Sequence, residues 1–104
     1  NNIYAMADCS MIDECKNALD LGFDIISTTL FGYTSYSNNF DGPDFESIKK
    51  IVEFSNKPVI AEGKINTPED LKKVFACGVF SAVVGSAITR PQLITQKFAD
   101  VLKK

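Results

Sequence analysis

Two apolar runs of the chain end in an acidic side chain, and these acids are the first candidates for chemistry. Glu62 directly follows Val-Ile-Ala, and Asp8 follows Ala-Met-Ala. A carboxylate at the end of a buried strand is partly desolvated, so it can donate and accept protons near neutral pH. The competing interpretations are a solvated strand-end acid, an ion pair of Glu62 with Lys64, and an Asp8 that only caps the next helix. Two such acids, each at the end of a predicted strand, predict general acid–base chemistry.

The residue types that the chain lacks narrow this chemistry further. The sequence contains no histidine, which excludes Cys–His and Ser–His nucleophile pairs and removes the commonest metal ligand. The three cysteines show neither CxxC nor zinc spacing, so we expect reduced thiols, no metal site and a cytoplasmic protein. Cys9 stands beside Asp8 without an activating partner in the sequence, and we expect it to be structural.

The stretch "VVGSAITRP" (83–91) has the composition of an anion-binding turn. Gly85 lets the backbone approach a ligand closely, Ser86 offers a hydroxyl and amides, and Arg90 could add a bidentate contact beside a helix N-terminus. Together with a turn at Gly63, this stretch predicts a phosphate site of the kind that barrels hold after their last strands. The competing interpretation is an ordinary strand-to-helix connection with a surface arginine.

The stretch "FGYTSYSNNFDG" (31–42) is longer than a plain turn between a strand and a helix. Its aromatic and small polar residues favour a lid or a sugar-contacting loop, in which Gly32 and Tyr33 are candidate substrate contacts. Thr28 and Thr29 precede it, separated from it by Leu30 at the end of an apolar run, and we place them in the same group. The competing interpretation is a variable surface loop.

Four β-rich apolar runs would have to position these residues: 3–9, 23–30, 57–63 and 80–87. Their near-continuous hydrophobicity is typical of parallel strands that are covered on both faces. Between and after the runs, apolar residues recur at helical spacing, which predicts four amphipathic helices. Their stripes are Ile12, Cys15, Ala18 and Leu19; Phe45, Ile48, Ile51 and Val52; Leu71, Val74 and Phe75; and Ile94, Phe98, Val101 and Leu102.

Local signals mark where three of these helices begin and where two of them end. Ser10, Thr67 and Thr89 each place a hydroxyl before a helix with an acid or amide three residues later, which predicts N-caps close to a capping box. Gly22 and Gly78 follow the first and third helices in similar contexts, which predicts a repeated unit of helix, glycine and strand.

The resulting order of elements is βαβαβαβα, which predicts parallel strands joined by right-handed crossovers. Two α/β architectures fit: four consecutive βα units of a TIM (β/α)₈ barrel, or a small doubly wound sheet. No glycine-rich nucleotide loop follows the first run, which weakens the second architecture. We therefore expect half a barrel, and an isolated half would leave open sheet edges.

Composition excludes several other classes of protein. The chain has 104 residues, 45% of them hydrophobic and 23% charged, which is ordinary for one small globular domain. The net charge is −2 without any basic block, so we expect no nucleic-acid partner. The longest apolar runs have the length of strands, so we expect no membrane span. The chain opens on Asn-Asn without an initiating Met, and we expect the interior of a longer protein.

Four segments together are similar to one family of enzymes. "ADCS", "GFDIISTTLFGYT", "PVIAEGKINTPEDLKK" and "VVGSAITRPQLIT" resemble the C-terminal half of bacterial N-acetylmannosamine-6-phosphate 2-epimerases. The resemblance implies that residues 1–104 form a partial TIM-barrel domain with strands 5–8 and their helices, the N-terminal half being absent. It also implies interconversion of N-acetylmannosamine 6-phosphate and N-acetylglucosamine 6-phosphate in sialic acid catabolism, without metal, nucleotide or other cofactor.

The resemblance also implies roles for individual residues. The family inverts C2 by removing its proton and returning one to the opposite face, with a lysine from the N-terminal half as the principal proton-transfer group. Glu62 matches a glutamate that assists this transfer, Asp8 a substrate-binding aspartate and Arg90 a phosphate-binding arginine. The backbone around Gly63, Gly85 and Ser86 would complete the phosphate site. Lys64 does not match the family's catalytic lysine and is retained only as a possible substrate contact.

The residues leave two other functions open. One is a different phosphosugar-binding barrel enzyme, such as a synthase or an aldolase. The other is a non-catalytic half-barrel that binds phosphate or serves as an assembly subunit. The 104 residues alone could be inactive, and we expect the chain to form homo-oligomers or to pair with the missing half of the barrel.

Overall fold

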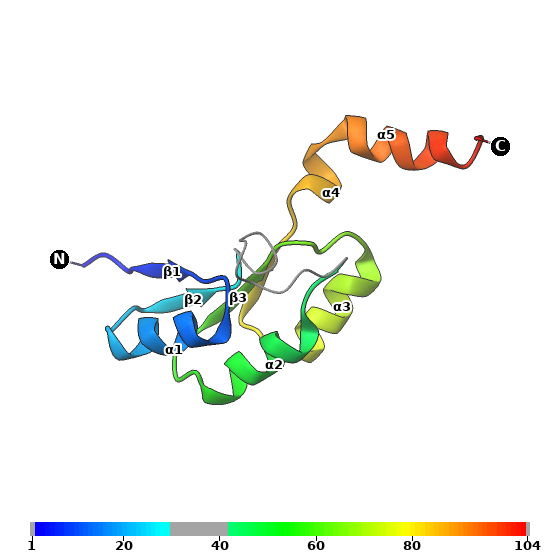
Figure 1. The fold of residues 1–104 in the computed structure, drawn as a ribbon. Coiled ribbons are helices and arrows are strands. Elements are labelled where there is room, and N and C mark those ends of the chain that lie inside the picture. Colours follow the sequence, from blue (N-terminus) through cyan, green and yellow to red (C-terminus); the bar gives the residue numbers. More distant parts are fainter. Residues whose placement is uncertain (1, 30–41, 104) are drawn as a thin grey trace.

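The computed structural model describes residues 2–29 and 42–103, which form a parallel sheet with helices between its strands (Figure 1). Its strands are β1 (Met6–Asp8), β2 (Ile25–Ser27), β3 (Val59–Glu62) and β4 (Ser81–Val83). Its helices are α1 (Ile12–Asp20), α2 (Phe45–Phe54), α3 (Pro68–Ala76), α4 (Ser86–Thr89) and α5 (Pro91–Asp100). The predicted alternation of strands and helices is confirmed. The predicted loop 31–42, with Gly32 and Tyr33, lies outside the described residues apart from Gly42.

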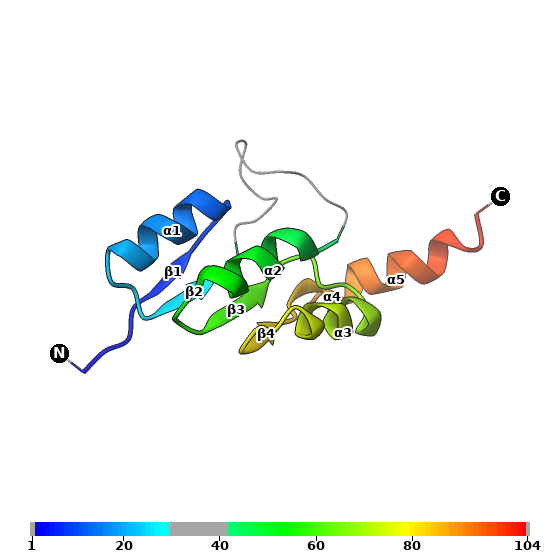
Figure 2. The same cartoon turned by 90° about the horizontal axis from the view of Figure 1, so that it is seen from below.

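The order of the strands decides between the two architectures. Each strand pairs in parallel with the next one along the chain, in the order β1-β2-β3-β4. A doubly wound sheet needs a point where the strand order reverses, and these strands have none. Right-handed crossovers that always advance in one direction place every helix on the same face, and α1, α2 and α3 do lie on one side of the sheet (Figure 2). This winding is that of a barrel.

The core lies between this sheet and the three helices. Ile26, Ala61, Ile51 and Val74 are fully buried there, so the predicted stripes of the second and third helices do face the sheet. The prediction that both faces of the strands are covered is wrong for the described residues. The strands alternate, and on the face away from the helices Met6 is 46% exposed. Only one face is covered because the helices α1–α3 share one side.

The helix starts confirm one predicted cap and correct another. The Thr67 hydroxyl accepts a hydrogen bond from the Asp70 amide at 3.0 Å, as a capping residue should. Ser10 is not the N-cap of α1, which begins one residue later than such a cap requires. Instead the Ser10 amide and hydroxyl both donate to the Glu14 carboxylate, at 2.7 and 2.6 Å. The acid four residues on has therefore reversed the expected direction of the bond.

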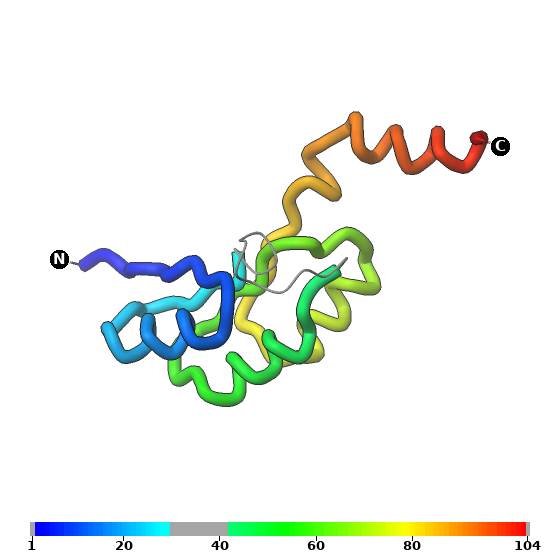
Figure 3. The backbone as a smooth tube through the Cα atoms, in the orientation of Figure 1, coloured from blue at the N-terminus to red at the C-terminus, as the bar shows by residue number. Residues whose placement is uncertain are grey.

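The end of the chain differs most from the prediction. The run 80–87 ends as a strand at Val83, and Thr89 closes α4 rather than capping a helix. The reason is local, because the Gly85 carbonyl accepts the Thr89 hydroxyl at 3.2 Å and closes a short helical turn. Beyond it α5 extends away from the sheet (Figure 3), and most of its predicted apolar stripe is exposed: Phe98, Val101 and Leu102 are each at least 75% exposed. Among the described residues no helix is long and apolar enough to cross a bilayer.

The matching glycines provide a test of the repeated helix ends. Gly22 and Gly78 follow α1 and α3 with φ of +90° and +95°, as predicted for C-terminal glycines. A Cβ at Gly78 would lie 3.1 Å from the Val52 side chain, whereas at Gly22 it would meet nothing within 4 Å.

We expect Gly22→Ala to destabilise the full-length protein by about 1–2 kcal/mol, the cost of the left-handed backbone. Gly78→Ala should cost about 1 kcal/mol more, because a tightly packed methyl adds strain. Chemical denaturation measures both, and equal losses would contradict the contact.

The Glu14 carboxylate predicts a pH dependence at the start of α1. The hydrogen bonds from the Ser10 hydroxyl and amide hold the pKa of Glu14 below its ordinary value of 4.5. These hydrogen bonds therefore stabilise the fold fully when the pH is above the ordinary pKa of Glu14. Their contribution is lost as the pH falls through the lowered pKa of the folded state. Glu14→Gln should lower the free energy of unfolding at pH 7 by under about 1 kcal/mol, because solvent screens this partly exposed group. The difference between wild type and variant should shrink as acid is added. A difference that stays constant down to acid unfolding would refute the linkage.

Candidate active site

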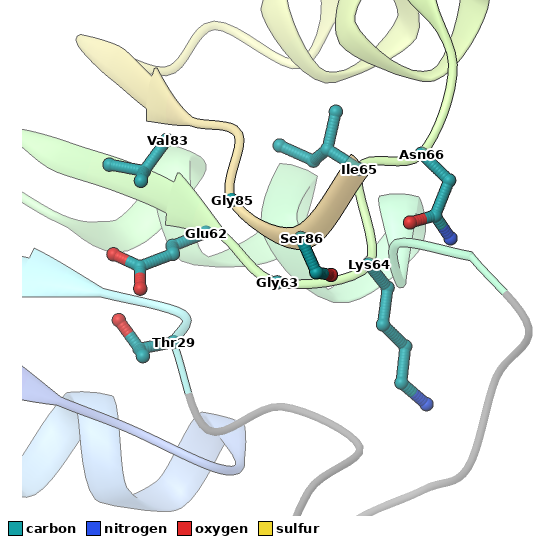
Figure 4. Close-up of a pocket in the computed structure, with 9 residues that line it drawn as sticks. All are labelled: Thr29, Glu62, Gly63, Lys64, Ile65, Asn66, Val83, Gly85 and Ser86. Carbon is teal, nitrogen blue, oxygen red and sulfur yellow. The ribbon is translucent and has the colours of Figure 1, made fainter. Parts of the chain in front are cut away.

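The carboxyl ends of β2, β3 and β4 open onto a pocket of about 350 Å³ (Figure 4). In a barrel this is the rim where substrates bind, because the loops that follow parallel strands all meet there. The pocket contains apolar, acidic, basic and amide side chains within a few residues of one another. Its lining residues are Thr29, Glu62, Gly63, Lys64, Ile65, Asn66, Val83, Gly85 and Ser86.

Most of the predicted site residues meet at this pocket. It brings together six of them from three strand ends: Thr29, Glu62, Gly63, Lys64, Gly85 and Ser86. Asp8 lies beside it on β1 and is joined to Thr29 by a hydrogen bond. Thr28 and Arg90 do not line it, and Gly32 and Tyr33 lie outside the described residues. The functional roles of all these residues remain predictions.

The end of β3 turns sharply just after its acid. Glu62 is the last residue of the strand, half-buried, and pairs with Val83 of β4. Gly63 and Lys64 then adopt φ of +105° and +61°. Glycine reaches this region freely, but a lysine there is strained, and such residues concentrate at functional sites. The side chains of Glu62 and Lys64 point in different directions in Figure 4, the acid toward Thr29 at the end of β2 and the lysine away from it.

A chain of hydroxyls holds the acid on β1. The Thr29 hydroxyl donates to the Asp8 carboxylate at 3.2 Å and is itself hydrogen-bonded to the Ser27 hydroxyl. Because a threonine hydroxyl carries one proton, the Ser27 hydroxyl is the donor in the second bond. Asp8 and Ser27 are register partners on adjacent strands, so they share the face of the sheet that lies away from the helices. The carboxylate therefore has a fixed orientation at the rim.

Two residues of this arrangement escaped the sequence analysis. Ser27 was read as part of an apolar strand, although alternation along 23–30 would have placed it on the same face as Thr29. Asn66 lines the pocket between the turn at Gly63 and the cap of α3. Its signal was a polar side chain in a short connection between a strand and a helix, which is where barrel sites are built.

The predicted phosphate side is only partly assembled. Gly85 and Ser86 line the same pocket as the turn at Gly63, and Gly85 precedes the four-residue helix α4. The helix start expected at Thr89 lies instead at Arg90, which is the N-cap residue of α5. Its guanidinium belongs to an exposed residue outside the pocket lining. The glycines and the serine thus meet in the structure, and the arginine lies one short helix away.

None of the three cysteines lines the described part of the pocket. Cys9 and Cys15 are 2% and 0% exposed, and they contact each other beneath the rim. A hydrogen bond from Cys15 lowers the pKa of the Cys9 thiol, and the same contact together with burial raises the pKa of Cys15. A buried pair of this kind agrees with the structural role expected of Cys9. Within the described ranges, no cluster of three or more acidic or thiol side chains could hold a metal ion.

Comparison with known proteins gives one consistent answer. The family model described as putative N-acetylmannosamine-6-phosphate epimerase matches residues 1–104. A putative N-acetylmannosamine-6-phosphate 2-epimerase of Clostridioides difficile is 55% identical over 103 residues, which are 99% of this chain and 46% of that protein. The chain therefore spans about half the length of the curated relatives that it matches.

Solved structures agree with the fold. The N-acetylmannosamine-6-phosphate 2-epimerase from Clostridium perfringens superposes with a TM-score of 0.90 at 53% identity, over 96% of this chain and 44% of that one. A thiamine phosphate pyrophosphorylase from Pyrococcus furiosus superposes with a TM-score of 0.68 at 26% identity, over 84% and 41%. The prediction of four consecutive βα units of a TIM barrel is confirmed by the first of these superpositions.

Proposed function

The chain belongs to the N-acetylmannosamine-6-phosphate epimerase family, and from that premise we propose that the full-length protein interconverts N-acetylmannosamine 6-phosphate and N-acetylglucosamine 6-phosphate. The observation that carries this proposal is the match of the family along all 104 residues, together with Glu62 at a pocket that Gly85 and Ser86 also line. An acid for the sugar and a glycine-rich wall for its phosphate then stand within one cavity.

The chemistry follows from the position of C2 in the substrate. When the sugar ring is open, the C2 proton is next to the C1 carbonyl, and its removal gives an enolate that can be protonated on either face. Such a reaction needs a base, an acid and a group that stabilises the negative charge. We assign Glu62 to proton handling or to stabilising this intermediate, beside a principal lysine in the preceding half of the barrel. Asp8, oriented by Thr29, would hold a hydroxyl of the opened sugar.

The phosphate would bind at the part of the pocket that the glycines and Ser86 line. Backbone amides at Gly63, Gly85 and Ser86 can approach an anion closely because two of the three residues have no side chain. Arg90 would reach the same phosphate from the start of α5. Lys64 and Thr29 also line the pocket, and we retain them as substrate contacts. Gly32 and Tyr33 keep the substrate-binding role predicted from the sequence, whereas Thr28 is buried outside the pocket lining and is not assigned a substrate contact.

We place residues 1–104 as strands 5–8 of the barrel, with the face that carries Met6 and Val83 turned toward the interior. The preceding half of the barrel would cover this face, and a homo-oligomer is the expected assembly. The reaction belongs to sialic acid catabolism in the cytoplasm and uses no cofactor in this proposal. A different phosphosugar-barrel enzyme is the second candidate, because the likeness to the thiamine phosphate pyrophosphorylase of P. furiosus shows that a similar half-barrel occurs in an enzyme named for another phosphorylated compound.

Solvent-deuterium exchange tests the proposed reaction in the full-length protein. Incubated in D₂O with N-acetylmannosamine 6-phosphate, the wild type should place deuterium at C2 and form N-acetylglucosamine 6-phosphate, as seen by NMR. Glu62→Gln should slow both by about 100- to 10,000-fold, the usual contribution of a general acid or base. Glu53→Gln, an exposed glutamate on α2, is the matched control and should react as the wild type does.

Two results would overturn the assignment. A wild-type protein that incorporates no deuterium at C2 is not this epimerase. A Glu62→Gln variant that exchanges at the wild-type rate removes Glu62 from the chemistry. Turnover of other sugar phosphates with equal efficiency would favour the second candidate.

Arg90 gives a separate test of the phosphate side. Arg90→Gln should raise KM for the phosphorylated substrate by about 10- to 100-fold, because a hydrogen bond between charged groups contributes about 1.5–3 kcal/mol. The change should leave kcat within a few fold, since the arginine lies far from C2 in this arrangement. Lys97→Gln removes an exposed positive charge from the same helix and is the matched control. Equal KM values for the two variants would refute a phosphate contact at Arg90.

A further inference from the structure

Thr28 is a buried threonine whose hydroxyl binds the backbone of the candidate catalytic residue. It follows the last residue of β2 and is 2% exposed. Its hydroxyl accepts a hydrogen bond from the Glu62 amide at 3.1 Å and donates one to the Glu62 carbonyl at 3.2 Å. One hydroxyl has one proton and two lone pairs, so both bonds can exist at once. The side chain thus holds both polar backbone groups of Glu62.

These two bonds replace the regular pairing between the strands. Before Glu62, β2 and β3 are joined by backbone hydrogen bonds. The Ile26 amide donates to the Pro58 carbonyl at 3.0 Å, and the Thr28 amide donates to the Ile60 carbonyl at 3.1 Å. In a regular parallel ladder the next amide, that of Glu62, would donate to a backbone carbonyl of β2. The strand β2 has ended by then, and the Thr28 hydroxyl is the acceptor for the Glu62 amide. Among the described residues, one hydroxyl makes both hydrogen bonds to the Glu62 backbone on this side.

The surroundings of Glu62 make this attachment consequential. On its other side, Glu62 is in register with Val83 of β4. Directly after it, Gly63 and Lys64 turn the chain with positive φ, so no regular strand continues to hold the acid in line. Within the described part of the chain, the Thr28 hydroxyl is the contact that holds Glu62 on the β2 side just before that turn.

We infer that Thr28 is a positioning residue: its hydroxyl, rather than its packing, sets where the Glu62 carboxylate stands at the rim. Thr28 itself does not line the pocket. Its neighbours Ser27 and Thr29 point to the other face and hold Asp8. Three consecutive hydroxyl residues thus secure an acid on each neighbouring strand, Asp8 through its side chain and Glu62 through its backbone. The kinetic consequence, though not the contact itself, rests on the proposed function.

Two substitutions in the full-length protein separate the hydroxyl from the packing. Thr28→Val keeps the shape and removes the hydroxyl, whereas Thr28→Ser keeps the hydroxyl. We expect Thr28→Val to lower kcat by about 10- to 100-fold with KM nearly unchanged, because small displacements of a catalytic group have effects of this size. Thr28→Ser should recover kcat to within a few fold. Thr95→Val, at an exposed threonine on α5, is the matched control and should leave kcat and KM unchanged.

A double-mutant cycle with Glu62→Gln distinguishes positioning from a general loss of structure. If Thr28 acts through Glu62, Thr28→Val should cost little more once Glu62→Gln has removed the carboxylate. If the hydroxyl only supports the fold, Thr28→Val should lower kcat by the same factor in both backgrounds. That second result would overturn the inference, as would a Thr28→Ser variant no better than Thr28→Val.

Amide hydrogen exchange tests the contact without any turnover. The Glu62 amide should be protected in the wild type and in Thr28→Ser, and should exchange at least about 10-fold faster in Thr28→Val, because its acceptor is gone. An unprotected Glu62 amide in the wild type would overturn the inference even in an active enzyme. A wild type that protects this amide but does not epimerise would refute the proposed function and leave the contact established, so the two failures are distinguishable.

Discussion

The parallel pairing of β2 with β3 is the contact on which the rest of the candidate site depends. It places Ile26 and Val59 side by side in the core and sets the level at which both strands reach the rim. Because all four strands run in the same direction, every connection after a strand emerges at that rim. The right-handed crossovers put α1–α3 on one face of the same sheet. One rule of connection therefore separates a packed face from a chemical edge.

The edge is built with polar groups that would be costly in the core. Ser27 and Thr28 are both fully buried, and each hydroxyl has a partner, Thr29 for the first and the Glu62 backbone for the second. Unpaired, such groups would destabilise the sheet where its ladder ends. The same bonds that satisfy them also fix two acids. Stability at the end of β2 and the geometry of the proposed chemistry are thus met by one set of contacts.

Much of this could be predicted from the sequence because the signals were local. Apolar runs, helical stripes and the glycines after α1 and α3 gave the order of elements, and the acid that ends β3 gave the centre of the pocket. The errors arose where two local partners competed. The Ser10 hydroxyl donates a hydrogen bond to Glu14 instead of capping α1. The Thr89 hydroxyl donates to the Gly85 carbonyl, which closes a helical turn instead of starting a new helix. Strand lengths failed for another reason, since a strand ends where its neighbour stops pairing, and no single segment contains that information.

Exposed apolar surface explains why the site is best understood as part of a larger barrel. Met6 and Val83 stand on the uncovered face of the sheet, Phe98 lies on α5 and Leu102 just after it, and each of the four is more than 40% exposed. Exposed apolar side chains on the sheet face and at the end of the chain favour an interface there. The relatives are about twice as long, so the proposed barrel has the additional strands and helices that would cover both surfaces. The same additional half would close the side of the pocket opposite Glu62 and bring the lysine that the proposed proton transfer needs. Burial of the open face and completion of the catalytic pair would then be consequences of the same closure.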